Sequence, residues 1–471
     1  MIERWTRCRA AIEGEDAIRE GKETYCPKPT GLEADEFKRY LQRASWYGAT
    51  QRTIDAMTGL IFRKDPDVML PDALYDLEES ASANGQSLLE LADFCVEEVL
   101  GLGRLGILVD FPQVENAEQQ TVAQAEAVGA RPYLATYTTE NIVNWRWRSV
   151  GARRVLGLVV LREFSVQPDP EDYFKEESVE QYRELALDEQ GFYFQRVWVK
   201  EDNEWIPGPQ NYPVMNSAPM TFIPFYAATP NGDDVDSLLP PLIDLVDLNI
   251  KHWINSAGYE HGVHFTCNPM PVITGWSPPA GTTITIGSER CLVLDDPQAK
   301  AFYMEFGGAG LDRADKAMAK KEKQMAVLGS RLLLEQTKGV EAAETAAIHR
   351  AGENSILGSV AQSVSKVLTR AYKVMVEWSG ADAEDVQVQL NTDFLPFALE
   401  PATITALMNA WQAGVISKRT LFQKLQEGEA IPPGVDFDAD QELIDEESMD
   451  DVSRNIPQPA QQQQELPVAE I

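Results

Sequence analysis

The chain has 471 residues, and its 74 Asp and Glu side chains outnumber the 41 Lys and Arg, which gives a formal net charge of −33 at pH 7. Proteins that coat nucleic acids or bind anionic membranes gain affinity from a cationic surface, so this composition argues against both classes. Hydrophobic residues make up 44% of the chain, enough for a sizeable core, and the length suits two to four domains.

Five scattered cysteines with no CxxC pair predict reduced thiols rather than a disulfide framework. The N-terminal residues contain no apolar segment typical of a signal peptide, and no apolar run reaches the roughly 18 residues that a membrane span needs. The sequence therefore predicts a soluble intracellular protein without a membrane contact.

The first part of the chain is predicted to be mainly helical. Residues 36–61 form one long amphipathic stretch, ended before Pro66. Ser87 and Glu90 have the spacing of a capping box at the start of a second helix. A short apolar run at 105–109 follows this helix and is predicted to be a strand.

Strand-like runs dominate the next part of the chain. Residues 115–131 are an Ala- and Gln-rich, exposed insertion, and the acidic block 168–184 is predicted to be a solvated excursion. The runs rich in β-branched and aromatic residues are 142–147, 155–164, 192–199 and 221–226. Together these features predict an α+β domain up to about residue 235.

The middle of the chain carries one long predicted helix. Residues 238–265, with Pro240 and Pro241 at their start, repeat apolar side chains at helical spacing over about 37 Å. A turn-rich β excursion at 267–290 follows. Short strands are expected at 272–273, 283–286, 292–294 and 301–306.

Helices return after the glycine-rich break at 307–310. They are predicted at 311–336, 342–378, 401–413 and 417–427. The stretch 427–451 contains eleven acids and no Lys or Arg, and the chain then ends in a polar tail that is predicted to be disordered.

The residues 101–106 match GxGxxG, the pattern of dinucleotide-binding turns. A dinucleotide fold needs the order strand, glycine turn, helix, whereas this segment has helix, glycines, strand. The pattern therefore favours a helix C-cap and tight turn over a nucleotide site.

Three histidines and a cysteine, His252, His261, His264 and Cys267, are close enough in sequence to suggest zinc, but no HExxH or CxxC pattern supports a metal. We therefore favour a role in polar packing or at an interface for the three histidines. Carboxylate pairs adjacent in sequence point to different sides of a helix, and no nucleophile motif stands out. We therefore expect no enzyme activity, no metal and no cofactor.

The predicted helix after residue 310 carries a basic face. Lys316, Lys320 and Lys323 share one side at i, i+4 and i+7, with Lys321 close by. In so acidic a chain, two interpretations stay open. The lysines form either a solvated face paired with acids, which is the commoner case, or a small positive ring that touches a passing polyanion.

Several blocks of sequence, in this order, resemble tailed-bacteriophage portal proteins. The blocks are YLQRASWYGAT at 40–50 with RTI at 52–54, GLIF at 59–62 and KDP at 64–66; QMAVLGSRLL at 324–333; EAAETA at 341–346, leading into a helix that ends at WSG, 378–380; and WQAGVIS at 411–417. The resemblance is to the branch long known only as a phage domain of unknown function, and it extends over about residues 5 to 445.

The resemblance implies an α+β virion protein that forms a ring of twelve copies at one capsid vertex, through which double-stranded DNA is packaged and ejected. It implies contacts with the major capsid protein, the terminase large subunit and a head–tail adaptor, and host cytoplasm as the place of assembly. Gly307, Gly308 and Gly310 would lie in or beside a channel loop, and Lys316, Lys320 and Lys323 would meet DNA.

The portal architecture implies the following division of the chain: wing, 1–237; stem helix, 238–266; clip with short strands, 267–295; return strand and channel loop, 296–310; channel and wing helices, 311–380; crown-like helices, 381–430; and acidic, polar tail, 431–471. One departure stands out, because many portals have a second stem helix directly after the clip and residues 276–306 are predicted to be β and turn. Alternatives are another virion protein, such as a head–tail adaptor, or an acidic cytosolic hydrolase.

Overall fold

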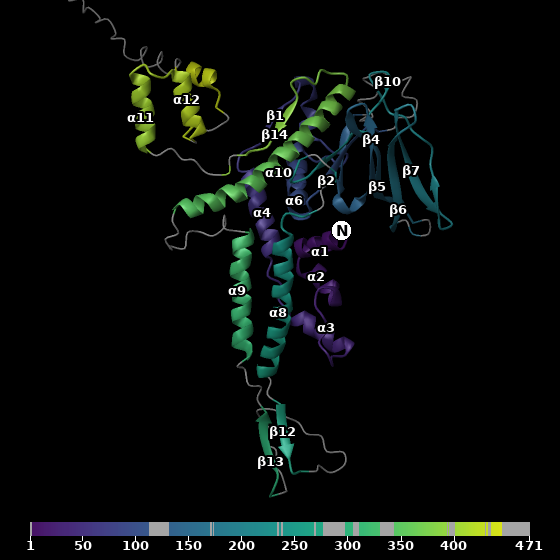
Figure 1. Cartoon of the computed structure of the whole chain (residues 1–471), viewed down its shortest axis with the longest axis vertical. Coiled ribbons are helices and arrows are strands. Elements are labelled where there is room, and N and C mark those ends of the chain that lie inside the picture. Colours follow the sequence, from purple (N-terminus) through teal and green to yellow (C-terminus); the bar gives the residue numbers. More distant parts are fainter. Residues whose placement is uncertain are drawn as a thin grey trace, which may run out of the picture. The chain divides into compact units, whose positions relative to one another are not determined.

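The computed structural model describes residues 2–112, 131–169, 172, 174–232, 235–236, 239–267, 270–276, 297–304, 310–329, 343–392, 394, 401–428, 430–431 and 435–444. The fold is α+β, as predicted (Figure 1). The chain divides into two compact units, Met1–Thr392 and Asp393–Ile471. Within the described residues, no helix is both long and apolar enough to span a membrane.

Twelve helical segments are described in the first unit. They are α1 (Ile2–Glu13), α2 (Glu15–Glu20), η1 (Lys22–Thr24), α3 (Ala34–Arg43), α4 (Ala49–Ile61), η2 (Asp72–Leu74), α5 (Asp76–Glu79), α6 (Leu88–Leu102), η4 (Thr139–Asn141), α8 (Ile243–Cys267), α9 (Leu311–Gly329) and α10 (Ala343–Trp378).

The larger sheet of this unit is antiparallel, in the order β4-β5-β6-β7-β8. Its strands are β4 (Ile142–Val150), β5 (Arg153–Pro168), β6 (Glu176–Leu187), β7 (Tyr193–Glu201) and β8 (Glu204–Pro207). A smaller sheet has the order β11-β2-β3, from β2 (Leu105–Asp110), β3 (Tyr133–Thr138) and β11 (Phe225–Ala228).

Three two-stranded pairs complete the unit. They are β1 (Asp67–Met69) with β14 (Gln387–Gln389), β9 (Val214–Met215) with β10 (Ala218–Pro219), and β12 (Met270–Thr274) with β13 (Lys300–Met304). Because β14 pairs with β1, the first compact unit includes residues up to Thr392, and the second begins within the range predicted to be crown-like.

The core has two parts. Helix α10 packs on α6, on the β2–β11 side of the smaller sheet and on β14, and its side chains Val360, Val364 and Leu368 are buried. The second part joins the N-terminal helices α1 and α3 to α8 through side chains such as Trp5, Tyr40 and Trp253. Burial of these large side chains contributes roughly 1.5–3 kcal/mol each.

Two local predictions near α6 are confirmed. The Ser87 Oγ accepts from the Glu90 N–H, and the Glu90 carboxylate accepts from the Ser87 N–H, so the capping box forms. At the other end, Gly103 adopts φ 82° as the C-cap, and β2 starts at Leu105. A Cβ at Gly103 would lie 2.8 Å from the Leu239 carbonyl oxygen. The glycines of the GxGxxG pattern therefore end α6 and allow the backbone at residue 239 to come close to Gly103.

The prediction of one continuous stretch over 36–61 is wrong. Helix α3 ends at Arg43, residues 44–48 are not helical, and α4 begins at Ala49. The break is held by tertiary structure, because the Ser45 N–H donates to the Ser256 Oγ on α8 over 2.9 Å. A contact 211 residues away in sequence leaves no local signal.

The prediction that 168–184 is a solvated excursion is also wrong from Glu176 onward, because these residues form β6 in the middle of the larger sheet. Glu176 and Glu177 are exposed, and charged residues further along the strand pair with the neighbouring strands. Arg183 on β6 pairs with Glu163 on β5 at 2.7 Å, and Glu184 on β6 pairs with Arg196 on β7 at 2.7 Å. Cross-strand ion pairs of this kind stabilise a sheet.

Other predicted elements agree in type and shift at their ends. Helix α8 begins two residues after Pro241 and extends to Cys267, and the run 221–226 supplies only the start of β11. The second unit contains α11 (Pro401–Gln412) and α12 (Lys418–Glu427), with Ser417 as the N-cap of α12. The predicted insertion at 115–131, apart from residue 131, the strands at 283–286 and 292–294, and the polar tail lie outside the described residues.

Candidate functional site

Helices α8 and α9 form an antiparallel pair (Figure 1). A Cβ at Gly262, late in α8, would lie 2.6 Å from the Leu311 side chain at the start of α9. At the middle of both helices, His252 Nε2 lies 3.1 Å from Glu322 Oε1. The β12–β13 hairpin connects the two helices in chain order, so the segment has the arrangement helix, hairpin, returning helix.

The two halves of α8 differ in environment. Its buried side chains all lie between Leu245 and Ala257. Helices α1, α3 and α4 pack against α8. From Gly258 onward the helix contains no fully buried residue, and Phe265 is 50% exposed. The first half anchors the pair in the core, and the second half carries the connection to the hairpin away from that core.

The lysine face predicted on α9 is exposed to solvent. Lys316, Lys320 and Lys323 are all exposed, while Met325 on the opposite side of the helix is 1% exposed. Within the described part of the chain, none of the three lysines makes an ion pair or hydrogen bond. Their positive charges are therefore available to a partner.

A groove runs beside this face, between the first half of α8 and the last turns of α9. Leu248, Val327 and Leu328 form its apolar part. Charged and polar residues line the rest: Asp244, Asp247, Lys251, Lys320, Lys323 and Gln324. Acidic and basic side chains both line the groove, so their charges largely cancel there, although the whole chain is strongly acidic.

Of the three glycines expected near a channel loop, the structure describes Gly310. Gly310 lies one residue before α9 and has no heavy atom within 4 Å of an added Cβ, so its surroundings are open. Gly307 and Gly308 lie outside the described residues.

The histidines of α8 take part in packing. His252 contacts the Tyr47 ring at 5.4 Å as well as Glu322, and His261 meets the rings of Tyr40 and Phe265 at 5.1 and 4.7 Å. Burial, followed by the charges of Arg43 and His264, lowers the pKa of His261. The described residues contain no group of three or more His, Cys, Asp or Glu side chains placed to hold a metal ion.

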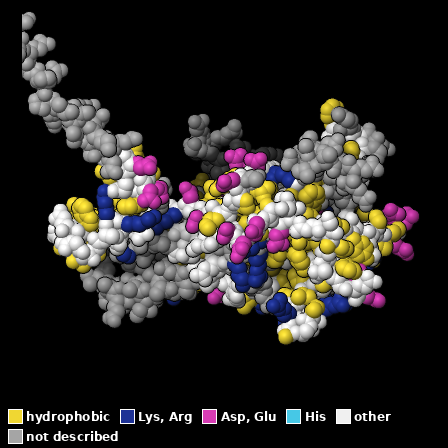
Figure 2. Space-filling model, turned by 90° about the horizontal axis from the view of Figure 1, so that it is seen from above, with side chains coloured by type: hydrophobic (Ala, Val, Ile, Leu, Met, Phe, Trp, Pro, Cys, Tyr) yellow, Lys and Arg dark blue, Asp and Glu magenta, His cyan; other side chains and the backbone are white. Residues whose placement is uncertain are grey.

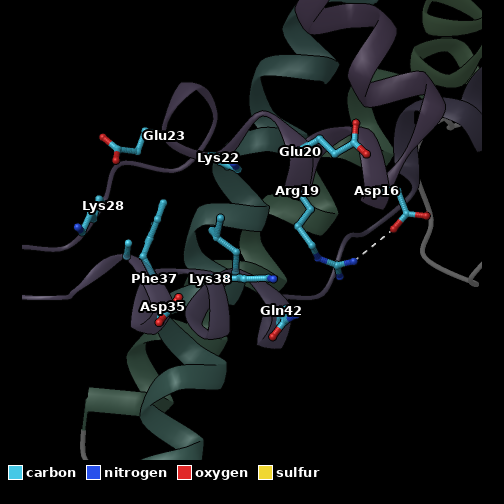
Figure 3. A pocket seen from close by; sticks show the side chains of 12 residues that line it. Asp16, Arg19, Glu20, Lys22, Glu23, Lys28, Asp35, Phe37, Lys38 and Gln42 are labelled. Carbon is cyan, nitrogen blue, oxygen red and sulfur yellow. Dashed lines mark hydrogen bonds and ion pairs between the residues drawn. The ribbon is translucent and has the colours of Figure 1, made fainter.

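A pocket of about 650 Å³ lies among α2, η1 and α3 (Figure 3). Phe37 and Leu41 contribute apolar surface, and acids and bases alternate around them. Arg19 is paired with Asp16 at 3.3 Å, and it also contacts Glu15. The described lining contains no Ser, Thr, Cys or His side chain.

Sequence reasoning missed a buried polar network between the two sheets. Arg183 donates to Glu163, Asp110 and Gln195, and Tyr137 donates to Glu163 at 2.6 Å. Burial alone would raise the pKa of Glu163, but Arg183 brings that pKa below its ordinary value. Each charged member has a partner in the network, so its role is to join the sheets.

A second missed feature is the fully buried Arg104. Its guanidinium lies between the rings of Trp5 and Trp145, at 5.1 and 4.7 Å, and donates to Thr139 and to the Val235 carbonyl. Burial lowers its pKa to about 10. Nothing in the local sequence marks this arginine, because its partners come from three distant segments.

A family model described as "Domain of unknown function (DUF4055)" matches residues 241–379, the segment that contains α8, the hairpin, α9 and α10. No curated protein matches the chain.

Solved structures give distant similarities. A chain from the neck of an empty gene transfer agent particle is 12% identical with a TM-score of 0.39, over 86% of this chain and 96% of that one. A chain from the virion of a native gene transfer agent particle is 11% identical with a TM-score of 0.40, over 88% and 99%. Similarities at this level carry no argument about function.

Proposed function

We propose that this chain is a structural protein of a phage-like virion, and that it is a portal subunit without enzyme activity. In this proposal, copies of the chain form a ring, expected to be of twelve, at one vertex of the capsid. Double-stranded DNA passes through the ring, and the terminase and a head–tail adaptor dock on it.

The observation that carries the proposal is the α8–hairpin–α9 segment. The portal resemblance of the sequence calls for a stem helix, a clip with short strands and a returning helix. Helix α9 follows β13 and runs back along α8. In this proposal α9 serves as the second stem helix, later in the chain than expected. The segment that matches the family model, 241–379, includes this whole unit.

The negative charge of the chain supports the proposal that DNA passes through the ring. A wall of like charge repels DNA phosphates, which keeps the duplex away from the wall and lowers friction. The unpaired Lys316, Lys320 and Lys323 would steady the duplex with few phosphate contacts, too few to trap it. Figure 2 shows acidic side chains spread over one face of the molecule, with Lys and Arg in small groups among them.

Electron microscopy of the purified full chain tests the ring directly. The expected result is annular particles with a central hole. A monomer under all assembly conditions would contradict the proposal, because ring closure requires two complementary faces on every copy.

The lysine role is tested by the triple variant Lys316→Gln, Lys320→Gln, Lys323→Gln. We expect normal rings and a severalfold fall in the DNA content of assembled particles, because three phosphate contacts are lost at every subunit. The matched control removes three lysines that line the α2–α3 pocket, Lys22, Lys28 and Lys38, and should package normally. Equal packaging by both variants would show that the α9 lysines do not meet DNA.

A further inference from the structure

The larger sheet extends into a narrow two-stranded ribbon. Strands β4 and β5 pair as far as Val150 with Arg153, whereas β6 joins β5 only from Leu158 onward. The ribbon, defined as residues 147–156, therefore projects past the third strand of the sheet. Both of its strands and its turn are largely exposed.

Four arginines gather on this ribbon and at its base. Arg146, Arg148, Arg153 and Arg154 are all exposed, and in the part of the chain that the structure describes none is paired with a carboxylate. Elsewhere in the same sheet, Arg183 and Arg196 are paired with acids. In a chain of net charge −33, an unpaired group of four arginines is a local exception.

The register places positive charge on both faces of the ribbon. Arg148 pairs with Val155 and Arg153 with Val150, so these two arginines share one face. Arg154 lies on the other face, with its guanidinium 4.8 Å from the centre of the Trp147 ring. This cation–π contact restrains the guanidinium plane without neutralising its charge.

Arg148 is held by the neighbouring turn. It donates to the carbonyls of Asp188 and Glu189, at 2.8 and 3.4 Å, between β6 and β7. Gly157 permits this path, because a Cβ there would lie 3.0 Å from the Arg148 Cβ. The base of the ribbon is thereby fixed to the sheet, while Arg146, Arg153 and Arg154 remain free of hydrogen bonds within the described residues.

We propose that the β4–β5 ribbon binds the phosphate backbone of double-stranded DNA, at a site separate from the α9 lysines. The major groove of B-DNA admits a two-stranded β-ribbon, and its two walls are phosphate backbones, which matches arginines on both faces. The guanidinium group suits phosphate because it donates two parallel hydrogen bonds.

A protein partner is less well matched to this surface. Protein interfaces bury an apolar centre, whereas Val150, 55% exposed, is the only large hydrophobic residue of the ribbon that is strongly exposed. The binding is expected to be weak and independent of DNA sequence, because it depends on phosphates and opposes the overall charge of the chain.

The test measures binding of a fluorescent DNA duplex to the purified full chain, by anisotropy, over a range of salt concentrations. We compare wild type with the variant Arg146→Gln, Arg153→Gln, Arg154→Gln. We expect at least a tenfold loss of affinity at low salt, and the slope of log K against log salt should become shallower by about 2.7, since each phosphate contact contributes about 0.9. The variant with Lys at the same three positions should keep most of the binding, because it keeps the charge.

Two charge-matched controls separate this site from others. The Lys22, Lys28, Lys38 triple variant should bind DNA like wild type. The Lys316, Lys320, Lys323 triple variant should keep ribbon-dependent binding, whether or not rings form. The proposal is overturned if wild type fails to bind at low salt, if the arginine variant binds equally well, or if arginine loss abolishes ring assembly and leaves DNA binding unchanged.

Discussion

Helices α8 and α9 lie side by side and have opposite relations to the rest of the molecule. Eight of the side chains of α8 are buried, all between Leu245 and Ala257, whereas α9 has the one buried side chain Met325 in its described part. Helix α8 is fixed by the core formed with α1 and α3. Helix α9 contacts mainly α8, and its lysines 316, 320 and 323 are exposed, two of them beside the groove between the helices.

This difference in burial suggests that α8 mainly stabilises the fold, whereas α9 presents side chains to a partner. A residue buried in the first half of α8 is constrained by the shape of its neighbours, and a change there creates a cavity. A residue on the outer face of α9 contacts solvent, so its identity can follow the needs of a partner. The predictions below test this separation.

The largest expected effect comes from Trp253→Ala. Trp253 is fully buried in the core of α1, α3 and α8, so the variant should lose about 3–5 kcal/mol of the free energy of unfolding. Phe265→Ala, in the exposed half of the same helix, should lose less than about 1 kcal/mol. Urea denaturation measures both, and similar losses would show that the two halves of α8 are not distinct.

A smaller effect is expected where the two helices meet. The contact between His252 and Glu322 is half exposed on the glutamate side, so a double-mutant cycle with Gln at each position should give a coupling energy of about 0.2–1 kcal/mol. Lys323, the next residue on α9, points to solvent and should show no coupling with His252. Coupling of equal size to both residues would contradict this geometry.

The smallest effect concerns pH. Because the pKa of His261 is lowered in the folded state, the unfolded chain binds its proton more readily. The stability that depends on neutral His261 is fully present above its unfolded pKa of about 6.5 and is lost as the pH falls toward the folded pKa. The His261→Gln variant should therefore lose less stability than wild type on acidification, as followed by thermal unfolding from pH 7.5 to about 5. Parallel pH profiles would rule out a contribution from this histidine.

Features with a short-range cause were predictable from the sequence. The capping box at Ser87, the helix stop at Gly103 and the long helix that became α8 depend on neighbours within a few residues. The exposed side of α9 was likewise predictable, because helical spacing alone places Lys316, Lys320 and Lys323 together. The role of those lysines toward DNA stays a prediction.

Features set by distant partners were not predictable. The break after α3 depends on Ser256, and the strand β6 depends on Glu163 and Arg196 as counter-charges. The arginine ribbon went unnoticed because its four residues are ordinary in composition. The strand register shows that they project together, and among the described residues none of them forms an ion pair with a carboxylate.

The core that joins α1 and α3 to α8 has a consequence for biosynthesis. The ribosome releases Trp5 and Tyr40 about two hundred residues before Trp253, and at about 5–20 residues per second this interval lasts roughly 10–40 seconds. Until then, the apolar surface that α1 and α3 bury against α8 in the folded chain has no α8 to cover it. This core is therefore completed only when the middle of the message has been translated.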